Sequence, residues 1–397
     1  MLALPSTLFL SLLGLGQISS QIGFLSVNAY SIVKDHSGST FFDGWEFYGN
    51  YDNLTSGDVN WLNQPDAFSK KLVLTNSAGN AILKVDNTTD TPYPEKRDSI
   101  RITSKAAYGV GTLWIADIVH LPFGCSVWPA LWSMGPNWPH DGEIDIIEGI
   151  NLMDHNQMAL HTGPNCKHDP LPATAQKGKP LQTDCSVDAG CTVQETTPNS
   201  YGVGFNQAGG GVFATQFDAA GINIWFWSRP NVPKSITAAT GTSDISTDDW
   251  GVPSASYPSG ASCDIGSAFG PQRIVLDITL CGVWAGNPQF YDPQCKDQGT
   301  FGLCYNDNVV GSGTAKKFDE AYFEMRYLRT YTNGTATITG LDAAGSSSAG
   351  GSSGSSTQPG GSNGANQTGV PSSAMAIFSF SWKSLAAFSG IATFVSL

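Results

Sequence analysis

The segment Glu143–Glu148 constrains what this chain can fold into more than any other. It reads Glu-Ile-Asp-Ile-Ile-Glu, so three carboxylates lie among three isoleucines, with a glycine on each side. A β-branched run between turn residues predicts a buried strand. Buried charge is costly unless it is compensated. Because neighbouring acids oppose one another's ionisation, we expect at least one of them to hold a proton at neutral pH.

The spacing of the acids predicts an irregular strand. Side chains alternate in a regular strand, so Glu143 and Asp145 share a face while Glu148 points away. One extra residue after Asp145, a β-bulge, returns Glu148 to that face. The Cα atoms of the two glutamates are then roughly 13 Å apart, at about 3.3 Å per residue, and side chains leaning together leave roughly 5 Å between carboxyls. That separation is typical of retaining glycoside hydrolysis. An ordinary strand with solvent-facing acids at its ends is the alternative, and the isoleucines argue against it.

The acidic motif resembles the active-site strand of glycoside hydrolase family 16, whose pattern is E-[hydrophobic]-D-x-(x)-E. The six-residue form found here looks like the bulged version of the laminarinase-type members. The resemblance implies that Glu143 is the nucleophile and Glu148 the general acid/base. It implies that Asp145 orients and tunes the nucleophile.

The flanking segments extend this resemblance to roughly residues 30–331, in the pattern of fungal family-16 endo-β-glucanases. The segments that carry it are Trp128-Pro-Ala-Leu-Trp132, Trp138-Pro139, Met158–Gly163, Pro198–Gly202, Cys263–Gly266, Cys281–Gly286 and Ala321-Tyr-Phe323.

The same resemblance implies a set of substrate-binding residues. Trp128 and Trp284 should line a glucan-binding cleft, and Trp138 is a further candidate. Arg101 should hydrogen-bond sugar hydroxyls with its fork of donors, although a surface ion pair is the alternative. His161 should lie beside the active site, bonded to the sugar or to the carboxylates, and a satisfied core histidine is the alternative.

The sequence does not decide whether three further tryptophans lie in the core or at the cleft. Trp132, four residues after Trp128, belongs to the core or to the cleft. Trp225 and Trp227 belong to the core or to the outer cleft wall.

The rest of the chain predicts an all-β fold. Between residues 30 and 331, short strands alternate with turns rich in Gly, Asn, Asp and Pro, which is typical of one large antiparallel sandwich. The segment Ile222–Ser228 is apolar on both faces, as in a strand buried on both sides. The clearest strands are 72–75, 81–85, 99–104, 112–119, 158–161, 212–217, 222–228, 273–279 and 322–331. The family resemblance implies a concanavalin-like jelly-roll sandwich of two antiparallel sheets, which we place at residues 21–338.

Composition narrows the class of partner. Only 13% of residues are charged and the formal net charge is −13, which argues against nucleic acid and anionic membrane surfaces. Aromatic residues make up 11%, more than a core requires, and they fit a neutral β-glucan polymer as partner. We expect a monomer. The paired-acid chemistry needs no metal and no organic cofactor, while a structural Ca²⁺ remote from the cleft stays possible.

Eight cysteines without zinc-type spacing predict four disulfides and an oxidising compartment. Eight cysteines allow 105 pairings, so the sequence does not give the connectivity. Short separations favour Cys185–Cys191 and Cys295–Cys304.

Both ends of the chain predict export and tethering. Residues 1–20 read as a signal peptide. Residues 342–369 are a Ser/Gly-rich linker that cannot form a core, and 370–397 resemble a glycosylphosphatidylinositol (GPI) attachment signal that is removed. The attachment triplet is Asn363–Ala365 or Ser372–Ala374. A transmembrane anchor is the alternative, and Lys383 argues against it.

Four glycosylation sequons, taken together with the cysteines, favour a secreted glycoprotein and an extracellular or cell-wall location. They begin at Asn53, Asn87, Asn333 and Asn366.

Three functions fit these observations. The first is a retaining endo-β-glucanase acting on β-1,3 and possibly mixed-linkage 1,3-1,4 glucan. The second is a cell-wall transglycosylase of the same family, although the six-residue motif differs from the E-I-D-x-E form of the chitin–glucan crosslinkers. The third is a non-catalytic glucan-binding lectin, which would not need all three acids.

Overall fold

The computed structural model describes residues 29–312 and 317–341. The predicted signal peptide, linker, GPI signal and Asn366 sequon lie outside the described residues. Among the residues described, no helix has the length and apolar character needed to cross a membrane.

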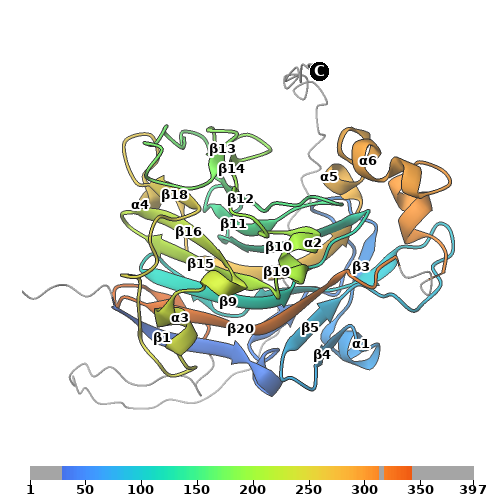
Figure 1. Cartoon of the computed structure of the whole chain (residues 1–397), viewed down its shortest axis with the longest axis horizontal. Coiled ribbons are helices and arrows are strands. Elements are labelled where there is room, and N and C mark those ends of the chain that lie inside the picture. Colours follow the sequence, from blue (N-terminus) through green and yellow to red (C-terminus); the bar gives the residue numbers. More distant parts are fainter. Residues whose placement is uncertain (1–28, 313–316, 342–397) are drawn as a thin grey trace, which may run out of the picture. The chain divides into compact units, whose positions relative to one another are not determined.

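Two large antiparallel sheets form the molecule within the described residues (Figure 1), which confirms the predicted sandwich. The eight-stranded sheet carries the acidic segment. Its strands, in spatial order, are β13 (Lys179–Pro180), β14 (Cys191–Gln194), β12 (Gln157–His161), β11 (Glu143–Glu148), β10 (Val127–Met134), β19 (Arg273–Leu280), β7 (Arg101–Ser104) and β2 (Trp45–Phe47).

The nine-stranded sheet forms the second layer. Its main path is β17 (Ile245–Ser246), β1 (Ala29–Ser37), β20 (Tyr322–Thr332), β9 (Thr112–His120), β15 (Gly211–Asp218), β16 (Gly221–Ser228) and β18 (Ala255–Pro258); β5 (Ala81–Lys84) also pairs with β20, and β4 (Val73–Thr75) with β5. Two small pairs complete the strands: β21 (Ile338–Thr339) with β8 (Ala107–Tyr108), and the parallel pair β3 (Val59–Trp61) and β6 (Arg97–Ser99). The predicted strand 99–104 is therefore divided at Ile100 between two sheets.

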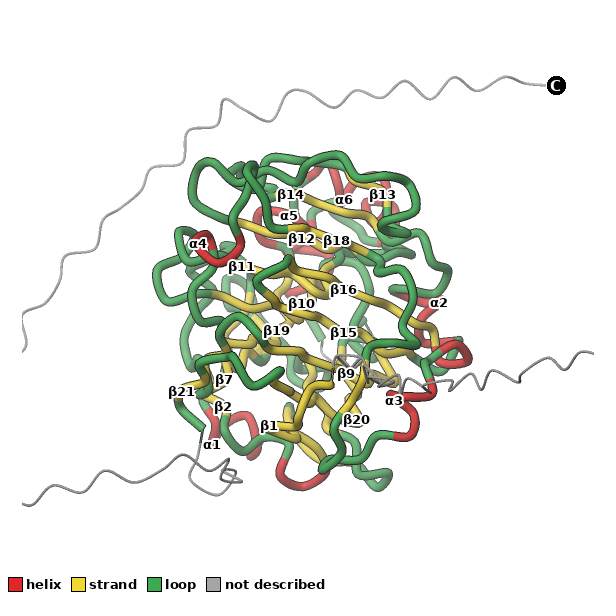
Figure 2. Tube along the Cα trace, turned by 90° about the vertical axis from the view of Figure 1, so that its left-hand side faces the viewer, coloured by secondary structure: helices red, strands yellow, loops and turns green. Residues whose placement is uncertain are grey.

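Helices are short and lie around the edges of the sheets (Figure 2). They are α1 (Gln64–Ser69), α2 (Gly202–Gln207), α3 (Lys234–Ala238), α4 (Ile265–Ala268), α5 (Gly282–Ala285) and α6 (Pro288–Cys295), with 3₁₀ or π turns η1 (Gly38–Thr40), η2 (Arg229–Asn231), η3 (Lys296–Gln298) and η4 (Tyr305–Val309). Helices α5 and α6 lie together at one end of the molecule, where they contact each other (Figure 1).

The main core lies between the two sheets. Alternate side chains of each strand enter it, as the period of two requires. From the eight-stranded sheet, Leu131 and Ile144 are at most 1% exposed, and Phe213 and Phe217 of β15 meet them from the other sheet in one apolar cluster. The alternate side chains of the eight-stranded sheet are left on its outer face, where the acids lie.

A second apolar cluster covers the other face of the nine-stranded sheet. Trp225 and Trp227 of β16 pack there against Trp250, whose ring lies edge-on to both. Ile222 and Ile224 of the same strand enter the main core. This confirms that β16 is buried on both faces, and it places Trp225 and Trp227 in a core rather than in a cleft wall.

All eight cysteines form disulfides, and one of the two predicted pairs is wrong. Cys185–Cys191 is confirmed, but Cys295 bonds Cys125 and Cys304 bonds Cys281. The fourth pair joins Cys166 to Cys263. Helix α6 ends at Cys295, which bonds the segment before β10, so the short separation of Cys295 and Cys304 in sequence did not make them a pair.

Candidate active site

The acidic strand β11 contains the predicted β-bulge. Against β10, Trp132 pairs with Asp145 and Leu131 with Ile147, so the strand gains one residue at Ile146. The register against β12 shifts at the same place, between Asp145 and Glu148. Ile146 and Ile147 are consequently both buried in the main core. The side-chain alternation restarts after them, and Glu148 returns to the face that carries Glu143 and Asp145.

Each of the three acids has a side-chain nitrogen close by, and the three nitrogens come from different segments. The indole of Trp138, in the loop between β10 and β11, donates to Glu143 Oε2. His161 Nε2, at the end of β12, lies 3.2 Å from Asp145 Oδ2. The remaining acid, Glu148, accepts a hydrogen bond of 3.0 Å at Oε1 from Trp128 Nε1 of β10. Glu143 and Glu148 therefore each accept a hydrogen bond that favours the ionised carboxyl, whereas Asp145 lies within ion-pair distance of His161.

Burial and mutual repulsion raise the pKa values of all three acids. The pKa of Glu143 rises to about 8, mainly because of burial and then because of the charge of Asp145. The pKa of Glu148 rises to about 7 for the same first reason, against the lowering effect of the Trp128 hydrogen bond. The pKa of Asp145 is raised well above its usual range by burial and by Glu148. The cluster therefore keeps a proton near neutral pH, as expected from the sequence.

The order of these pKa values does not by itself assign a nucleophile and an acid. Glu143 has the higher value in the free protein, whereas a nucleophile must be ionised. A glucan in the site would replace water around both carboxyls. The roles rest on the family pattern and on position along the bulged strand.

A fourth acid, which the sequence analysis missed, lies on the same face. Asp277 of β19 pairs in register with Ala130, which in turn pairs with Glu148. Its Oδ2 accepts a 3.1 Å hydrogen bond from Trp132 Nε1, and burial raises its pKa to about 6. The segment Arg273–Leu280 could have indicated this residue, because an acid within a strongly apolar strand is the same feature that marks Glu143–Glu148. The Trp132 bond also places that indole on the active-site face.

Arg101 lies on this face but is largely enclosed. It pairs in register with Asp277 and is only 4% exposed. Its guanidinium carbon lies 4.9 Å from the ring centre of Tyr48 and 5.2 Å from those of Trp61 and Trp132. The positive charge lowers the pKa of Asp277 against the effect of burial. The predicted alternative of a surface ion pair does not describe this arrangement.

The aromatic candidates differ in exposure. Trp128 is 7% exposed, and Trp284 of α5 meets it edge-on with ring centres 5.4 Å apart. Trp138, by contrast, is 53% exposed although its indole nitrogen reaches Glu143. Cys281–Cys304 and Cys125–Cys295 fix the segments around α5 and β10 that carry Trp284 and Trp128.

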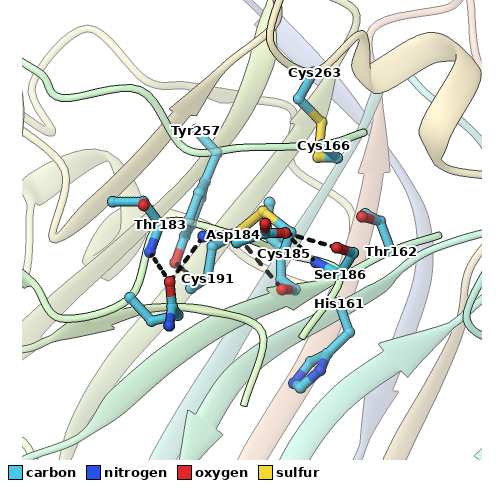
Figure 3. The surroundings of a disulfide bond; sticks show 12 residues. His161, Thr162, Cys166, Thr183, Asp184, Cys185, Ser186, Cys191, Tyr257 and Cys263 are labelled. Carbon is cyan, nitrogen blue, oxygen red and sulfur yellow. Dashed lines mark hydrogen bonds between the residues drawn. A yellow bond between two sulfur atoms is a disulfide. The ribbon is translucent and has the colours of Figure 1, made fainter. Parts of the chain in front are cut away.

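His161 is held by a small disulfide-closed loop. Cys185–Cys191 closes that loop beside the end of β12, and Figure 3 shows it with His161 and the Cys166–Cys263 disulfide. Gly190 of the loop, at φ +64°, packs so closely that an added Cβ would lie 2.9 Å from His161 Nε2. His161 is thus a site histidine paired with Asp145, not a core histidine. Glu143, Asp145 and His161 also bring one possible ligand atom each within 4.8 Å, close enough for a cation.

The family model for XgeA-like catalytic domains of glycoside hydrolase family 16 matches residues 45–331. Among curated relatives, a probable glycosidase of Schizosaccharomyces pombe is 38% identical over 76% of this chain and 69% of its own length. A probable endo-1,3(4)-beta-glucanase of Aspergillus niger is 36% identical over 86% of this chain. The chain spans only 45% of that Aspergillus protein, and about half of the similar ones from other Aspergillus species.

Two solved structures share both fold and sequence with the chain. Laminarinase 16A of Phanerochaete chrysosporium, solved with beta-glucans in its donor and acceptor sites, is 34% identical with a TM-score of 0.69; the match covers 77% of this chain and all of that one. An elongating family-16 beta-1,3-glucosyltransferase is 38% identical with a TM-score of 0.69, over 76% of this chain and all of that one. The bulged acidic strand, the sandwich that carries it and these matches agree, and the chain belongs to glycoside hydrolase family 16.

Proposed function

We propose that this protein is a retaining endo-β-glucanase that hydrolyses β-1,3 and mixed-linkage 1,3-1,4 glucan. The observation that carries the proposal is the bulge, which puts Glu143 and Glu148 of one strand on one face with Asp145 between them. The names of the relatives support the substrate class. The exposed indole of Trp138 and the half-buried Trp284 supply apolar surfaces of the kind that sugar rings pack against.

In the proposed mechanism, Glu148 protonates the leaving glycosidic oxygen while the Glu143 carboxylate attacks the anomeric carbon. A covalent glycosyl-enzyme forms, and the shortened chain leaves. Glu148, now ionised, takes a proton from water, which attacks the same carbon and releases Glu143. Asp145, 3.2 Å from His161, lies beside Glu143 and orients it. Two displacements at one carbon give retention of configuration.

Two substitutions test these roles. Glu143→Gln keeps the shape of the side chain but removes the nucleophile, so laminarin hydrolysis should fall by several orders of magnitude. Glu148→Ala should lose activity on laminarin. On 2,4-dinitrophenyl β-laminaribioside, whose leaving group departs without a proton, azide should then restore glycosyl transfer with the β configuration, measured by NMR of the product. Hydrolysis near the wild-type rate by Glu143→Gln would refute the nucleophile role of Glu143, and an α-glycosyl azide would refute the role of Glu148. A wild-type protein that binds laminarin without cleaving it would instead favour a glucan-binding protein.

A second candidate function is glucan elongation by transglycosylation. It is favoured by the 38% identity to a solved family-16 beta-1,3-glucosyltransferase along that protein's whole chain. The two functions share the glycosyl-enzyme and differ in whether water or a sugar hydroxyl accepts the glycosyl group. Incubation with laminarihexaose distinguishes them, since hydrolysis yields only shorter chains and transfer yields longer ones. The products formed from laminarin, from lichenan and from a mixture with chitin oligosaccharide acceptors then define the linkages that the protein cleaves and forms.

The proposal places the protein outside the cell, at the cell surface or in the wall. Four disulfides support an oxidising compartment. The sequon asparagines Asn53 and Asn333 are exposed, and Asn87 is partly exposed, so glycans have access to them. Release of the protein from intact cells by a phosphatidylinositol-specific phospholipase tests the predicted GPI anchor, and failure of release with the protein still on the cells would argue against it.

A further inference from the structure

The β-bulge in β11 leaves two backbone groups that the neighbouring strand cannot pair. On β12, Ala159 pairs with Asp145 and Gln157 with Glu148, so two residue steps on β12 face three on β11. The carbonyl of Ile146 and the N–H of Glu148 are the groups that need other partners. A buried backbone group without a partner costs about 1–3 kcal/mol.

One side chain satisfies both groups. Asn156, the residue before β12, accepts a 3.0 Å hydrogen bond at Oδ1 from the Glu148 N–H. Its Nδ2 donates a 2.9 Å hydrogen bond to the carbonyl of Ile146. An asparagine amide has both an acceptor and a donor on one short side chain, which this pair of groups requires. Alanine offers neither, and an ionised aspartate cannot donate.

Asn156 is itself held rigidly. The residue is 0% exposed. Its backbone N–H donates to Ser200 Oγ at 3.0 Å, and its carbonyl accepts from the Glu195 N–H at 2.9 Å. Its side chain therefore acts as a fixed template against which the bulge is formed.

We propose that Asn156 is a positioning residue that holds the bulge and thereby sets the place of the Glu148 carboxyl. The inference deepens the proposed function and rests on it, since it names what keeps the acid/base on the face of the nucleophile. Without the bulge, Glu148 would turn toward the core face, because a shift of one residue reverses every later side chain. Asn156 touches the backbone of Glu148 and acts on the reaction only through it.

The test compares two substrates that differ in their need for an acid. Laminarihexaose has a poor leaving group, whereas 2,4-dinitrophenyl β-laminaribioside has one that departs without a proton. Asn156→Ala should lower kcat/KM for laminarihexaose by about a hundredfold, within the range that general acid catalysis supplies. For the activated substrate, kcat/KM should fall at least tenfold less. A purely structural role would lower both values equally, and that result would overturn the proposal.

Asn206 provides a matched control. Its side chain likewise accepts from one backbone N–H and donates to a backbone carbonyl, both of Leu121, at 2.9 and 3.1 Å. It lies in α2 and serves the end of β9 in the other sheet. Asn206→Ala should leave the ratio of the two kcat/KM values unchanged. A change in that ratio equal to the change in Asn156→Ala would also overturn the proposal.

Asn156→Asp keeps the test usable if the alanine variant does not fold. A protonated carboxyl has one O–H donor and one acceptor, as the amide does, whereas the ionised form loses the donor. The activity of this variant relative to wild type at each pH should therefore rise as the pH falls. A flat ratio would refute the donor role. A fully active Glu143→Gln variant would refute the proposed function itself, in which Glu143 is the nucleophile. If Glu143→Gln is inactive and the activity of Asn156→Asp relative to wild type does not change with pH, only the role of Asn156 is refuted.

Discussion

The indole nitrogen of Trp128 donates a 3.0 Å hydrogen bond to Glu148 Oε1. The two residues lie on neighbouring strands, and Trp284 and Ile150 hold the indole in place in a small apolar cluster. A donor at this position stabilises the ionised form of the carboxyl and lowers its pKa, while burial raises it. Burial and the Trp128 hydrogen bond are the two largest influences on the value of about 7 for Glu148.

Trp128→Phe should raise the pKa of Glu148, because it keeps the ring but removes the donor. The alkaline limb of the kcat/KM profile, where the acid/base loses its proton, should move to higher pH. The shift should be about one unit, the size expected for a lost hydrogen bond of roughly 1.4 kcal/mol. The profile measured on laminarin at constant ionic strength checks this. An unmoved alkaline limb would show that the bond does not tune Glu148.

His161→Ala should move the profile in the same direction for a different reason. The charge of His161 lowers the pKa values of both Glu143 and Glu148. Its removal should therefore move both limbs of the kcat/KM profile to higher pH. The kcat value should fall about tenfold or more, because Asp145 loses its partner. His161→Gln is the matched variant, since an amide can still bond Asp145 but carries no charge. This variant should also move both limbs to higher pH, with a smaller fall in kcat. Limbs that keep their position in both variants would contradict the electrostatic role of His161.

Gly190→Ala should disturb the site through His161. The added Cβ would lie 2.5 Å from the Leu160 carbonyl and 2.9 Å from His161 Nε2, at a φ of +64°. Gly209 is the control, because it has a similar φ of +76° but open space around it. Both alanines should cost about 1 kcal/mol of backbone strain in thermal unfolding, and only Gly190→Ala should lower kcat. Equal kcat values in the two variants would show that the loop does not position His161.

Glu148→Gln should stabilise the protein at alkaline pH. The glutamate titrates near 4.3 in an unfolded chain and at about 7 in the folded protein. Its contribution to stability is therefore fully present below about pH 4 and is lost as the pH rises through 7. Glutamine cannot ionise, so the variant should gain on the wild type by roughly 3–4 kcal/mol at pH 8 and little at pH 4. Denaturant unfolding at both pH values measures this gain. Glu95→Gln, at an exposed position, should show no such pH-dependent difference.

Much of the fold could be read from local patterns. The nine clearest predicted strands all appear, because period-two patterns between turns need no knowledge of the partner strand. The bulge was also predictable, since three acids and three isoleucines can be sorted to opposite faces only if one residue is added. The division of 99–104 at Ile100 was not, because both halves have the same local character and differ only in which strand they meet.

The sequence predicted the three acids of the active-site strand but not the residues that surround them. Asp277 is 129 or more residues from the acidic strand in sequence, and only the order of β11, β10 and β19 brings it into register with Glu148. The enclosure of Arg101 depends in the same way on distant segments, because its three aromatic neighbours are Tyr48 after β2, Trp61 of β3 and Trp132 of β10. No residue pattern around Asn156 indicates that it will bond the backbone of a bulge eight to ten residues earlier.

The sequence by itself determined which face of β11 is acidic, that the strand is bulged, and that the domain is a disulfide-bonded β-sandwich. These properties follow from side-chain alternation and composition, which act over a few residues. Tertiary structure alone decided that Trp138, His161 and Trp128 each serve one acid, that Cys295 bonds Cys125, and that Asn156 closes the bulge. Those contacts join segments that are far apart in the sequence. Strand order and loop path bring these segments together, and the spacing of residues along the chain encodes neither the order nor the path.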